Sequence, residues 1–304
     1  MLKVGLILYS VREEMARDPI GTVEKVGKLG YRSIEVCNHS ADTDPGCGFG
    51  VSAQELRAAF DRCGSHVISA HIDPLDRADL DAVVEYEQTL GNHNIVNPMG
   101  RYTGYDDVMR QIEGFNTTGR RLHELGMTYL YHNHHHEYRT YGGKSILDLI
   151  VENTDPDYVS LELDTFWTMR AGRNPVEMLK HFGPRVRLVH QKDFAWDAVV
   201  PINLNGITPA DWEVPEGGEP SFWGSAEPKD EAEAARQREA YTSAFTEIGQ
   251  GIMPIQAIID TASACTNAEY IILEQDYTRM PSQIDSIRKS MESFRKFQGI
   301  TWED

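Results

Sequence analysis

Residues 158–193 read YVSLELDTFWTMRAGRNPVEMLKHFGPRVRLVHQKD, and this stretch gives the clearest indication of the fold. Its two ends, 158–167 and 186–193, are short runs rich in Val and Leu, which are typical of buried strands. The residues between them predict a helix over 174–182. A strand, a helix and a second strand in this order predict two parallel strands joined by a crossover helix.

The same rhythm extends to both ends of the 304-residue chain. Further strands are predicted over residues 4–10, 31–39, 66–73, 93–98, 128–134 and 269–276. Further helices are predicted over residues 19–29, 52–64, 78–91, 105–125, 144–153, 254–265 and 282–297. Eight strand–helix units in order predict an α/β fold, a (β/α)8 TIM barrel that forms one domain over residues 1–304.

Residues 194–247 interrupt this rhythm after the seventh strand, where a connection of a few residues would be enough. The segment contains Trp196, Trp212 and Trp223, and a charged stretch over 229–241 that predicts a helix. Because three tryptophans are too apolar for a disordered acidic segment, we expect the insertion to fold. It is predicted to form a lid over the barrel mouth or a partner-binding segment.

Composition limits the class of partner. The formal net charge of −18 argues against a nucleic acid or an anionic membrane, because phosphate groups would be repelled over most of the surface. The four cysteines form no C-x-x-C pair, and the first apolar run is too short for a signal peptide or a membrane span. These features predict a cytoplasmic protein with reduced thiols.

In a TIM barrel the active site lies at the carboxyl ends of the strands. The predicted strands end in polar residues there: Glu35, His71, His132, His134, Glu137, Glu162, Asp164, His190, Lys192, Glu274 and Asp276. Strand alternation places several of them on inward faces, where unpaired charges are costly. A divalent cation bound by carboxylates and an imidazole would explain this pattern. Mn²⁺ is the predicted ion, and Mg²⁺, Co²⁺ or Zn²⁺ also suit such ligands.

Several motifs resemble the sugar phosphate isomerase/epimerase superfamily, the xylose isomerase-like TIM barrels that also include apurinic-site endonucleases. LELDTFW (161–167), LVHQKD (188–193) and IILEQD (271–276) are similar to the motifs that carry this family's metal ligands. YHNHHHEY (131–138) resembles the strand-5 signature of one branch, and TEIGQGIM (246–253) is similar to a Gly-rich segment before the last unit. The resemblance implies that Asp164 and His190 bind the metal, and that Glu274 is both a ligand and a base.

Two positions depart from the family pattern. Epimerases of the family carry a Glu at the end of strand 5, where this chain has Tyr131 and His132. We therefore expect Glu137 to be the fourth metal ligand, and His134 or His132 to be the mobile acid/base. The second departure is Trp167, where relatives often carry a His. Its presence argues against the trinuclear zinc cluster of the endonucleases, and its ring can stack on a sugar or an aromatic group.

Some residues keep two interpretations. His71 is either a substrate contact or a core histidine, and Glu35 binds either substrate or backbone. Lys192 is either catalytic or part of a structural ion pair with Asp193. The histidines of 132–136 are either a site or a polar surface loop.

A cation beside a carboxylate and an imidazole favours removal of a proton next to a carbonyl, without an organic cofactor. The enolate can be reprotonated, as in an epimerase or isomerase, or can expel a substituent, as in a lyase. Loss of the strand-5 Glu weakens the epimerase interpretation.

The YHNH-type strand 5 and the insertion resemble the catalytic α subunit of C-glycoside deglycosidases, which implies a Mn²⁺-dependent lyase for 3-keto C-glycosides with a small β subunit. The alternatives are a sugar or sugar-phosphate isomerase/epimerase and an inosose-type dehydratase. The expected partners are a carbohydrate or glycoside substrate and either a β subunit or further copies of the chain. A carbohydrate-binding barrel without activity would be expected to break the ligand set, which is intact here.

Overall fold

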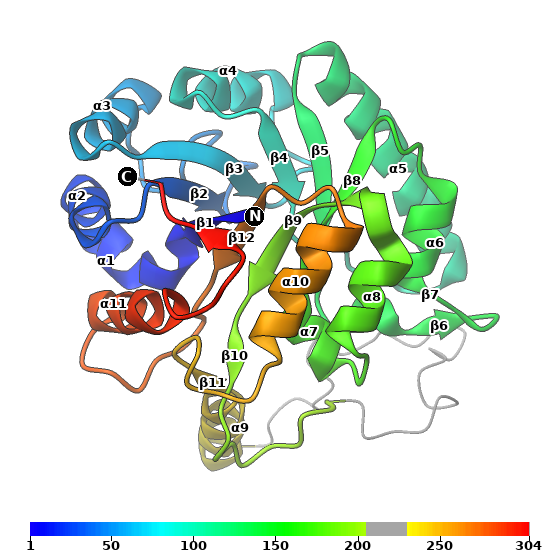
Figure 1. The fold of residues 1–304 in the computed structure, drawn as a ribbon. Helices are drawn as coiled ribbons and strands as arrows, with labels where there is room; N and C mark the ends of the chain where they lie inside the picture. Colours follow the sequence, from blue (N-terminus) through cyan, green and yellow to red (C-terminus); the bar gives the residue numbers. More distant parts are fainter. Residues whose placement is uncertain (205–229, 304) are drawn as a thin grey trace.

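The computed structural model describes residues 1–204 and 230–303, and it places eight parallel strands in a closed barrel (Figure 1). These are β1 (Leu2–Ile7), β2 (Ser33–Asn38), β3 (His66–Ile72), β4 (Asn94–Asn97), β5 (Thr128–His132), β8 (Val159–Asp164), β9 (Val186–Gln191) and β12 (Tyr270–Leu273). The strands pair in chain order, and a parallel β12–β1 pairing closes the ring. A short strand, β13 (Ile300–Thr301), is added beside β1.

The outer layer consists of the helices that connect successive strands (Figure 1). They are α2 (Pro19–Leu29), α3 (Ala53–Cys63), α4 (Leu80–Leu90), α5 (Tyr105–Glu124), α6 (Ile146–Asn153), α8 (Pro175–Phe182), α10 (Ile255–Cys265) and α11 (Gln283–Phe294). The predicted (β/α)8 barrel is therefore confirmed. No helix of the described residues is long and apolar enough to cross a bilayer.

Local signals in the sequence set the helix ends. At the start of α3, the Ser52 side chain accepts a hydrogen bond from the Glu55 backbone N–H, and the Glu55 carboxylate accepts one from the Ser52 N–H. This reciprocal pair satisfies two backbone donors that a helix start leaves open. Gly30 ends α2 with a φ of 107°, a left-handed conformation in which a Cβ would be strained.

The barrel interior has an apolar layer beneath a polar one. The apolar layer consists of Ile7, Cys37, Ile68, Val96, Leu130, Leu188 and Ile272. On three strands the buried polar residue follows two positions later on the same face: His132 after Leu130, His190 after Leu188 and Glu274 after Ile272. The alternation that builds the core therefore also directs the polar side chains into the barrel mouth.

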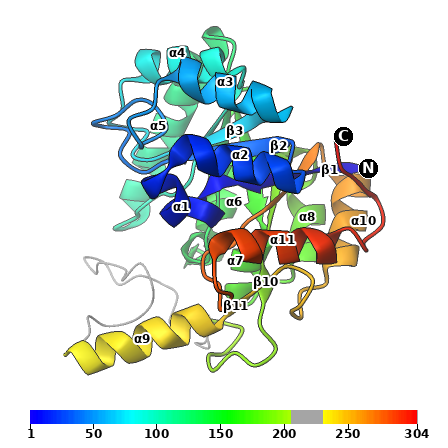
Figure 2. The ribbon, with the colours of Figure 1, turned by 90° about the vertical axis from the view of Figure 1, so that its left-hand side faces the viewer.

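The segment between β9 and α10 adds three described elements at this end of the barrel. Strand β10 (Asp193–Phe194) pairs antiparallel with β11 (Phe245–Thr246), and α9 (Glu231–Ser243) agrees with the helix predicted over 229–241. Figure 2 shows α9 at the same end of the molecule as β10 and β11. Trp196 is 78% exposed. Trp212 and Trp223 lie outside the described residues.

Two short helices were not predicted. One is α1 (Arg12–Arg17), and the other is α7 (Thr165–Arg170), which begins directly after β8. The sequence predicts the apolar residues Phe166 and Trp167 as the end of a strand. In the structure the Asp164 side chain accepts a hydrogen bond from the Trp167 backbone N–H and so caps α7. This helix places both Trp167 and Arg170 in the wall of the cavity described next.

Candidate metal centre and active site

A cavity of about 500 Å³ opens at the carboxyl ends of the barrel strands. Its inner wall includes His71, His132, Lys192 and Glu274, which lie on or directly after four of the strands. Residues of the insertion contribute to its outer wall: Val200, Leu204, Arg238, Ala240 and Tyr241. The predicted insertion therefore lines the same cavity as the polar strand ends.

Four side chains converge at the inner end of this cavity. His132, Asp164, His190 and Glu274 come from or follow four different strands, and their ligand atoms all lie within 4.8 Å of one another. The Nδ1 atom of His190 is 2.9 Å from Oε2 of Glu274, and Nε2 of His132 is 3.8 Å from Oδ2 of Asp164. All four are buried, so their charges and lone pairs need partners.

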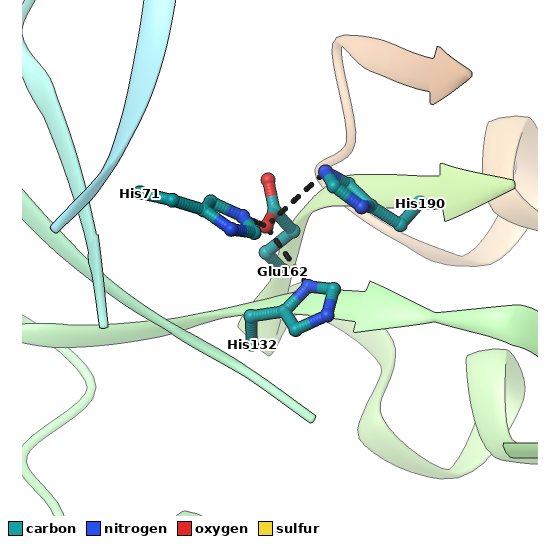
Figure 3. Close-up of side chains that lie close together, drawn as sticks. All are labelled: His71, His132, Glu162 and His190. Atoms are coloured by element: carbon teal, nitrogen blue, oxygen red, sulfur yellow. Dashed lines mark hydrogen bonds and ion pairs between the residues drawn. The ribbon is translucent and has the colours of Figure 1, made fainter. Parts of the chain in front are cut away.

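A second group lies immediately beneath the first and is centred on Glu162 (Figure 3). Its Oε2 atom is 2.6 Å from Nε2 of His71, 3.0 Å from Nδ1 of His132 and 3.4 Å from Nε2 of His190. Glu35 adds a second carboxylate, whose Oε1 is 2.7 Å from Nε2 of His190. The rings of His71 and His190 are stacked with their centroids 5.1 Å apart.

His132 and His190 belong to both groups. Each of these two histidines directs one ring nitrogen to the lower group and the other to the upper group. His132 directs Nδ1 to Glu162 and Nε2 towards Asp164, whereas His190 directs Nε2 to Glu35 and Nδ1 to Glu274. A buried carboxylate that accepts a hydrogen bond from one ring nitrogen fixes the orientation of an imidazole and so directs its other nitrogen. The lower carboxylates therefore orient both imidazoles towards the upper group.

The residues present fit a divalent cation. Two imidazoles and two carboxylates form a common donor set for transition metals, and it is richer in nitrogen than the single imidazole predicted from sequence. The chemistry also favours an added cation, because the buried carboxylates of Asp164 and Glu274 converge with two imidazoles, all four ligand atoms lying within 4.8 Å of one another. The identity of the ion stays a prediction, with Mn²⁺ preferred and Mg²⁺, Co²⁺ or Zn²⁺ as alternatives.

Lys192 is buried among the carboxylates at the cavity floor. Its Nζ donates to Oδ2 of Asp164 at 2.7 Å and to Oε2 of Glu274, and it lies 3.9 Å from Oδ1 of Asp276. Burial alone would lower the pKa of Lys192, but these three carboxylates raise it. Burial also raises the pKa of Asp276, to about 8. Lys192 therefore remains a cation whose first role is to hold Asp164 and Glu274 in place.

The predicted alternative for Lys192, an ion pair with Asp193, is not what the structure contains. The carboxylate of Asp193 instead accepts hydrogen bonds from the backbone N–H groups of Gly249, Gly251 and Met253. It thus anchors the Gly-rich segment 246–253 that precedes α10.

The sequence profile of the family described as xylose isomerase-like TIM barrel matches residues 23–297, which is most of the chain. The chain belongs to the xylose isomerase-like TIM barrel family. This confirms the resemblance inferred from the strand-end motifs.

Several known proteins are similar to this chain in sequence or in structure. An inosose dehydratase from Geobacillus kaustophilus is 32% identical over 208 residues, which cover 58% of this chain and 62% of that protein. The chain therefore spans less than two thirds of that relative. A solved structure from Parabacteroides distasonis, named a sugar phosphate isomerase/epimerase, covers 99% of this chain and 96% of its own with a TM-score of 0.72 at 21% identity.

A solved structure from Bacillus anthracis, named a probable 3-DHS dehydratase, covers 97% of this chain and 99% of its own with a TM-score of 0.63 at 11% identity. At such identities the solved structures are evidence for the fold alone.

For a xylose isomerase-like barrel, the position of Glu137 is a correction to the expected ligand set. Glu137 lies in the short 3-10 turn His136–Tyr138 and is absent from both groups of candidate ligands formed by the described residues. Its Oε1 accepts a hydrogen bond from the Tyr131 hydroxyl at 2.7 Å, and its Oε2 accepts one from the His134 backbone N–H at 2.9 Å. The turn directs the carboxylate into the loop, and His132 takes the fourth place in the upper group.

The remaining predicted residues divide between the cavity wall and the layer below it. His134 and Trp167 line the cavity with their ring centroids 5.3 Å apart, and burial lowers the pKa of His134. His71 also lines the cavity, although its Nε2 is bonded to Glu162. Glu35, predicted to contact substrate, lies instead beneath the cavity and accepts a hydrogen bond from Ser69. The histidines of 132–136 are not a surface loop, because all but the half-buried His134 are fully buried.

Glu162 is the residue that sequence reasoning left without a role. The available signal was its spacing, because it lies two positions before Asp164 and so shares the inward face of β8.

Proposed function

We propose that this protein is a divalent-metal-dependent lyase that removes the proton beside the ketone of a sugar or cyclic polyol and then expels a hydroxyl as water. The observation that carries the proposal is the convergence of His132, Asp164, His190 and Glu274 at the floor of a cavity. The name of the Geobacillus relative, inosose dehydratase, supports this choice among the reactions that the family catalyses.

The cation, when bound, would supply a Lewis acid that stabilises negative charge developing on the ketone oxygen. The Glu274 carboxylate then removes the proton from the neighbouring carbon, while Lys192 holds that carboxylate in position. His134, which lines the same cavity and is kept neutral by burial, accepts this proton from Glu274 at one ring nitrogen and delivers a proton from the other to the departing hydroxyl. The removed proton and the departing hydroxide together make one water, so no oxidant or reductant is needed.

The network beneath the cavity supports these roles. Glu162 and Glu35 fix the rings of His132 and His190, so that little reorganisation is required when the substrate binds. The indole ring of Trp167 lines the wall beside His134 and provides an apolar face for a sugar ring.

The experiment is a proton NMR assay in D₂O of the chelator-treated protein, with and without added Mn²⁺. Candidate substrates are an inosose, simple ketoses, their phosphorylated or carboxylated analogues and a 3-keto C-glycoside. We expect metal-dependent loss of water from the keto-polyol. Deuterium exchange without elimination would instead identify an isomerase or epimerase, and release of the aglycone would identify the narrower C-glycoside lyase.

Three variants assign the roles in the same assay. Glu274→Gln and His190→Ala should abolish turnover and lower the metal content, whereas His134→Ala should lose turnover and keep the metal. His181→Ala is the matched control, because His181 is a half-exposed histidine that pairs with Asp148 far from the cavity. Full turnover by Glu274→Gln would overturn the proposal.

A further inference from the structure

Arg170 is a buried cation in the wall of the active-site cavity. It is the last residue of α7, six residues after Asp164, and its side chain is 1% exposed. At the rise of an α-helix, six residues separate the two backbone positions by roughly 9 Å along the axis. Arg170 lines the same cavity as the candidate metal ligands His132 and Glu274.

The guanidinium of Arg170 lacks the partners that a buried cation normally has. Its Nε and Nη1 atoms are buried, and neither has a hydrogen-bond partner among the residues that the structure describes. No carboxylate of residues 1–204 or 230–303 forms an ion pair with it. Its neighbours are aromatic, with the ring of Phe194 centred 5.0 Å and that of Phe166 centred 6.0 Å from Cζ.

Aromatic rings stabilise the flat faces of a guanidinium but leave the N–H groups at its edge unsatisfied. Burial lowers the pKa of Arg170 to about 10, so the group is still charged at neutral pH. Buried arginines are almost always paired, and an unsatisfied one in a cavity wall calls for an explanation.

Lys192, which lines the same cavity, provides the contrast. Its ammonium donates hydrogen bonds to the carboxylates of Asp164 and Glu274, so its charge is already paired within the protein. Arg238 of α9 also lines the cavity but is exposed to solvent. The cavity thus has a floor where the buried ammonium is held by carboxylates, and a wall where a buried guanidinium has no carboxylate partner among the described residues.

We propose that Arg170 is the binding group for an anionic substituent of the substrate, a carboxylate or a phosphate, while the ketone of the same molecule lies at the cluster of His132, Asp164, His190 and Glu274. This inference rests on the proposed function and names its substrate class, a keto acid or a phosphorylated ketose or polyol. The forked N–H geometry of arginine suits both anions, because each presents two oxygens.

The test uses the full-length metal-loaded protein, labelled with ¹⁵N-arginine. Inorganic phosphate and acetate are titrated separately, with glycerol as the neutral control, and the Nε–Hε signal of Arg170 is followed by NMR. Loss of that signal in Arg170→Met assigns it. We expect one of the two anions, and not glycerol, to shift this signal in a saturable manner, and the stronger of the two identifies the class of substituent.

Anion affinity is then compared between Arg170→Met and Arg173→Met by calorimetry. Arg173 is exposed, and its replacement makes the same change of charge three residues away. The first variant should bind the anion about tenfold to a hundredfold more weakly, as expected for one lost charge-assisted bond, and the second should bind it as the wild type does. Equal affinity in all three proteins would overturn the inference.

If Arg170→Met does not fold, Arg170→Lys supplies the same comparison, since it keeps the charge and loses the fork; unchanged affinity in that variant would also overturn the inference. Repeating the titration in His190→Ala separates the two proposals. Anion binding at Arg170 should survive in a variant that has lost turnover.

Discussion

Oε2 of Glu162 accepts a hydrogen bond from Nδ1 of His132 at 3.0 Å, and the other ring nitrogen of His132 points towards Asp164. The same oxygen lies within 3.4 Å of ring nitrogens of His71 and His190. One buried carboxylate therefore sets the orientation of three imidazoles, two of which belong to the candidate metal site. The positions of the His132 and His190 rings therefore depend on Glu162, which is not itself one of the four upper ligands.

Glu162→Gln tests this dependence. An amide keeps the size of the side chain but carries no negative charge, so its oxygen accepts more weakly from the imidazole N–H groups than the Oε2 atom of the carboxylate does. We expect affinity for Co²⁺ to fall about 10- to 100-fold, as is typical for the loss of a carboxylate behind a histidine ligand. The measurement is a titration followed by the visible absorption of bound Co²⁺, and a buried Glu→Gln change at Glu87, in α4, is the control. Unaltered Co²⁺ affinity would mean that Glu162 serves the barrel core alone.

Lys192→Met addresses the charge balance of the cavity floor. Removal of the ammonium leaves the carboxylates of Asp164 and Glu274 buried without their shared partner. We expect the metal-free variant to lose about 3–5 kcal/mol of unfolding free energy, the usual cost of breaking a buried pair. Because an added divalent cation replaces the missing charge, Mn²⁺ should raise the melting temperature of the variant more than that of the wild type. An equal rise in melting temperature on adding Mn²⁺ to the two proteins would contradict the idea that the cation replaces the charge of Lys192.

Strand alternation predicts part of this site. The eight strands and the inward direction of Asp164, His190 and Glu274 follow from alternation, because residues two apart on a strand share a face. Glu162 has the same parity as Asp164, and its place one layer deeper, roughly 7 Å along the strand, was implicit in that spacing. Alternation predicts which face of a strand a residue occupies. It does not predict how deep the cavity extends, and so does not tell whether Glu162 lines the cavity or lies beneath it.

Glu137 and Arg170 mark a different limit. Both lie beyond the end of a strand, where the path of the chain is set by tertiary contacts. The hydrogen bonds of Glu137 to Tyr131 and to the His134 backbone decide its direction. Arg170 lies on a helix whose first residues, Thr165–Trp167, have the β-branched and aromatic character of a strand. The Asp164 cap overrides that local preference.

Tyr241→Ala tests the contribution of the insertion to the cavity. The Tyr241 ring lies 6.3 Å from the ring of Trp167 in a stacked arrangement and 5.2 Å from that of Phe245. Loss of one such aromatic contact should lower kcat/KM about two- to tenfold, chiefly through KM, because the cavity wall loosens without a change at its floor. Steady-state kinetics on the substrate found by the NMR assay provide the measurement. Tyr241→Phe, which keeps the ring, should behave nearly as the wild type does, and an equal loss in both variants would point to the hydroxyl instead.

Glu87 provides a pH-dependent prediction away from the site. It is fully buried in α4, where Asn92 donates to its Oε2 at 2.9 Å and Oε1 has no partner among the described residues. Burial raises the pKa of Glu87 to about 7 from an ordinary value of 4.5. Folding therefore favours the protonated form of Glu87. The contribution of this group to the free energy of unfolding is fully present below pH 4.5 and is lost as the pH rises through 7.

Glu87→Gln should remove this loss, because an amide does not titrate. Chemical denaturation at pH 8 should show the variant more stable than the wild type by up to about 3 kcal/mol, the linkage equivalent of the shifted pKa. The two proteins should converge near pH 4. Glu85→Gln is the matched control, since Glu85 is exposed two residues away on the same helix and should follow the wild type throughout. If the unfolding free energies of Glu87→Gln and the wild type changed with pH in the same way, the pKa of Glu87 would not be raised in the folded protein, and this prediction would be wrong.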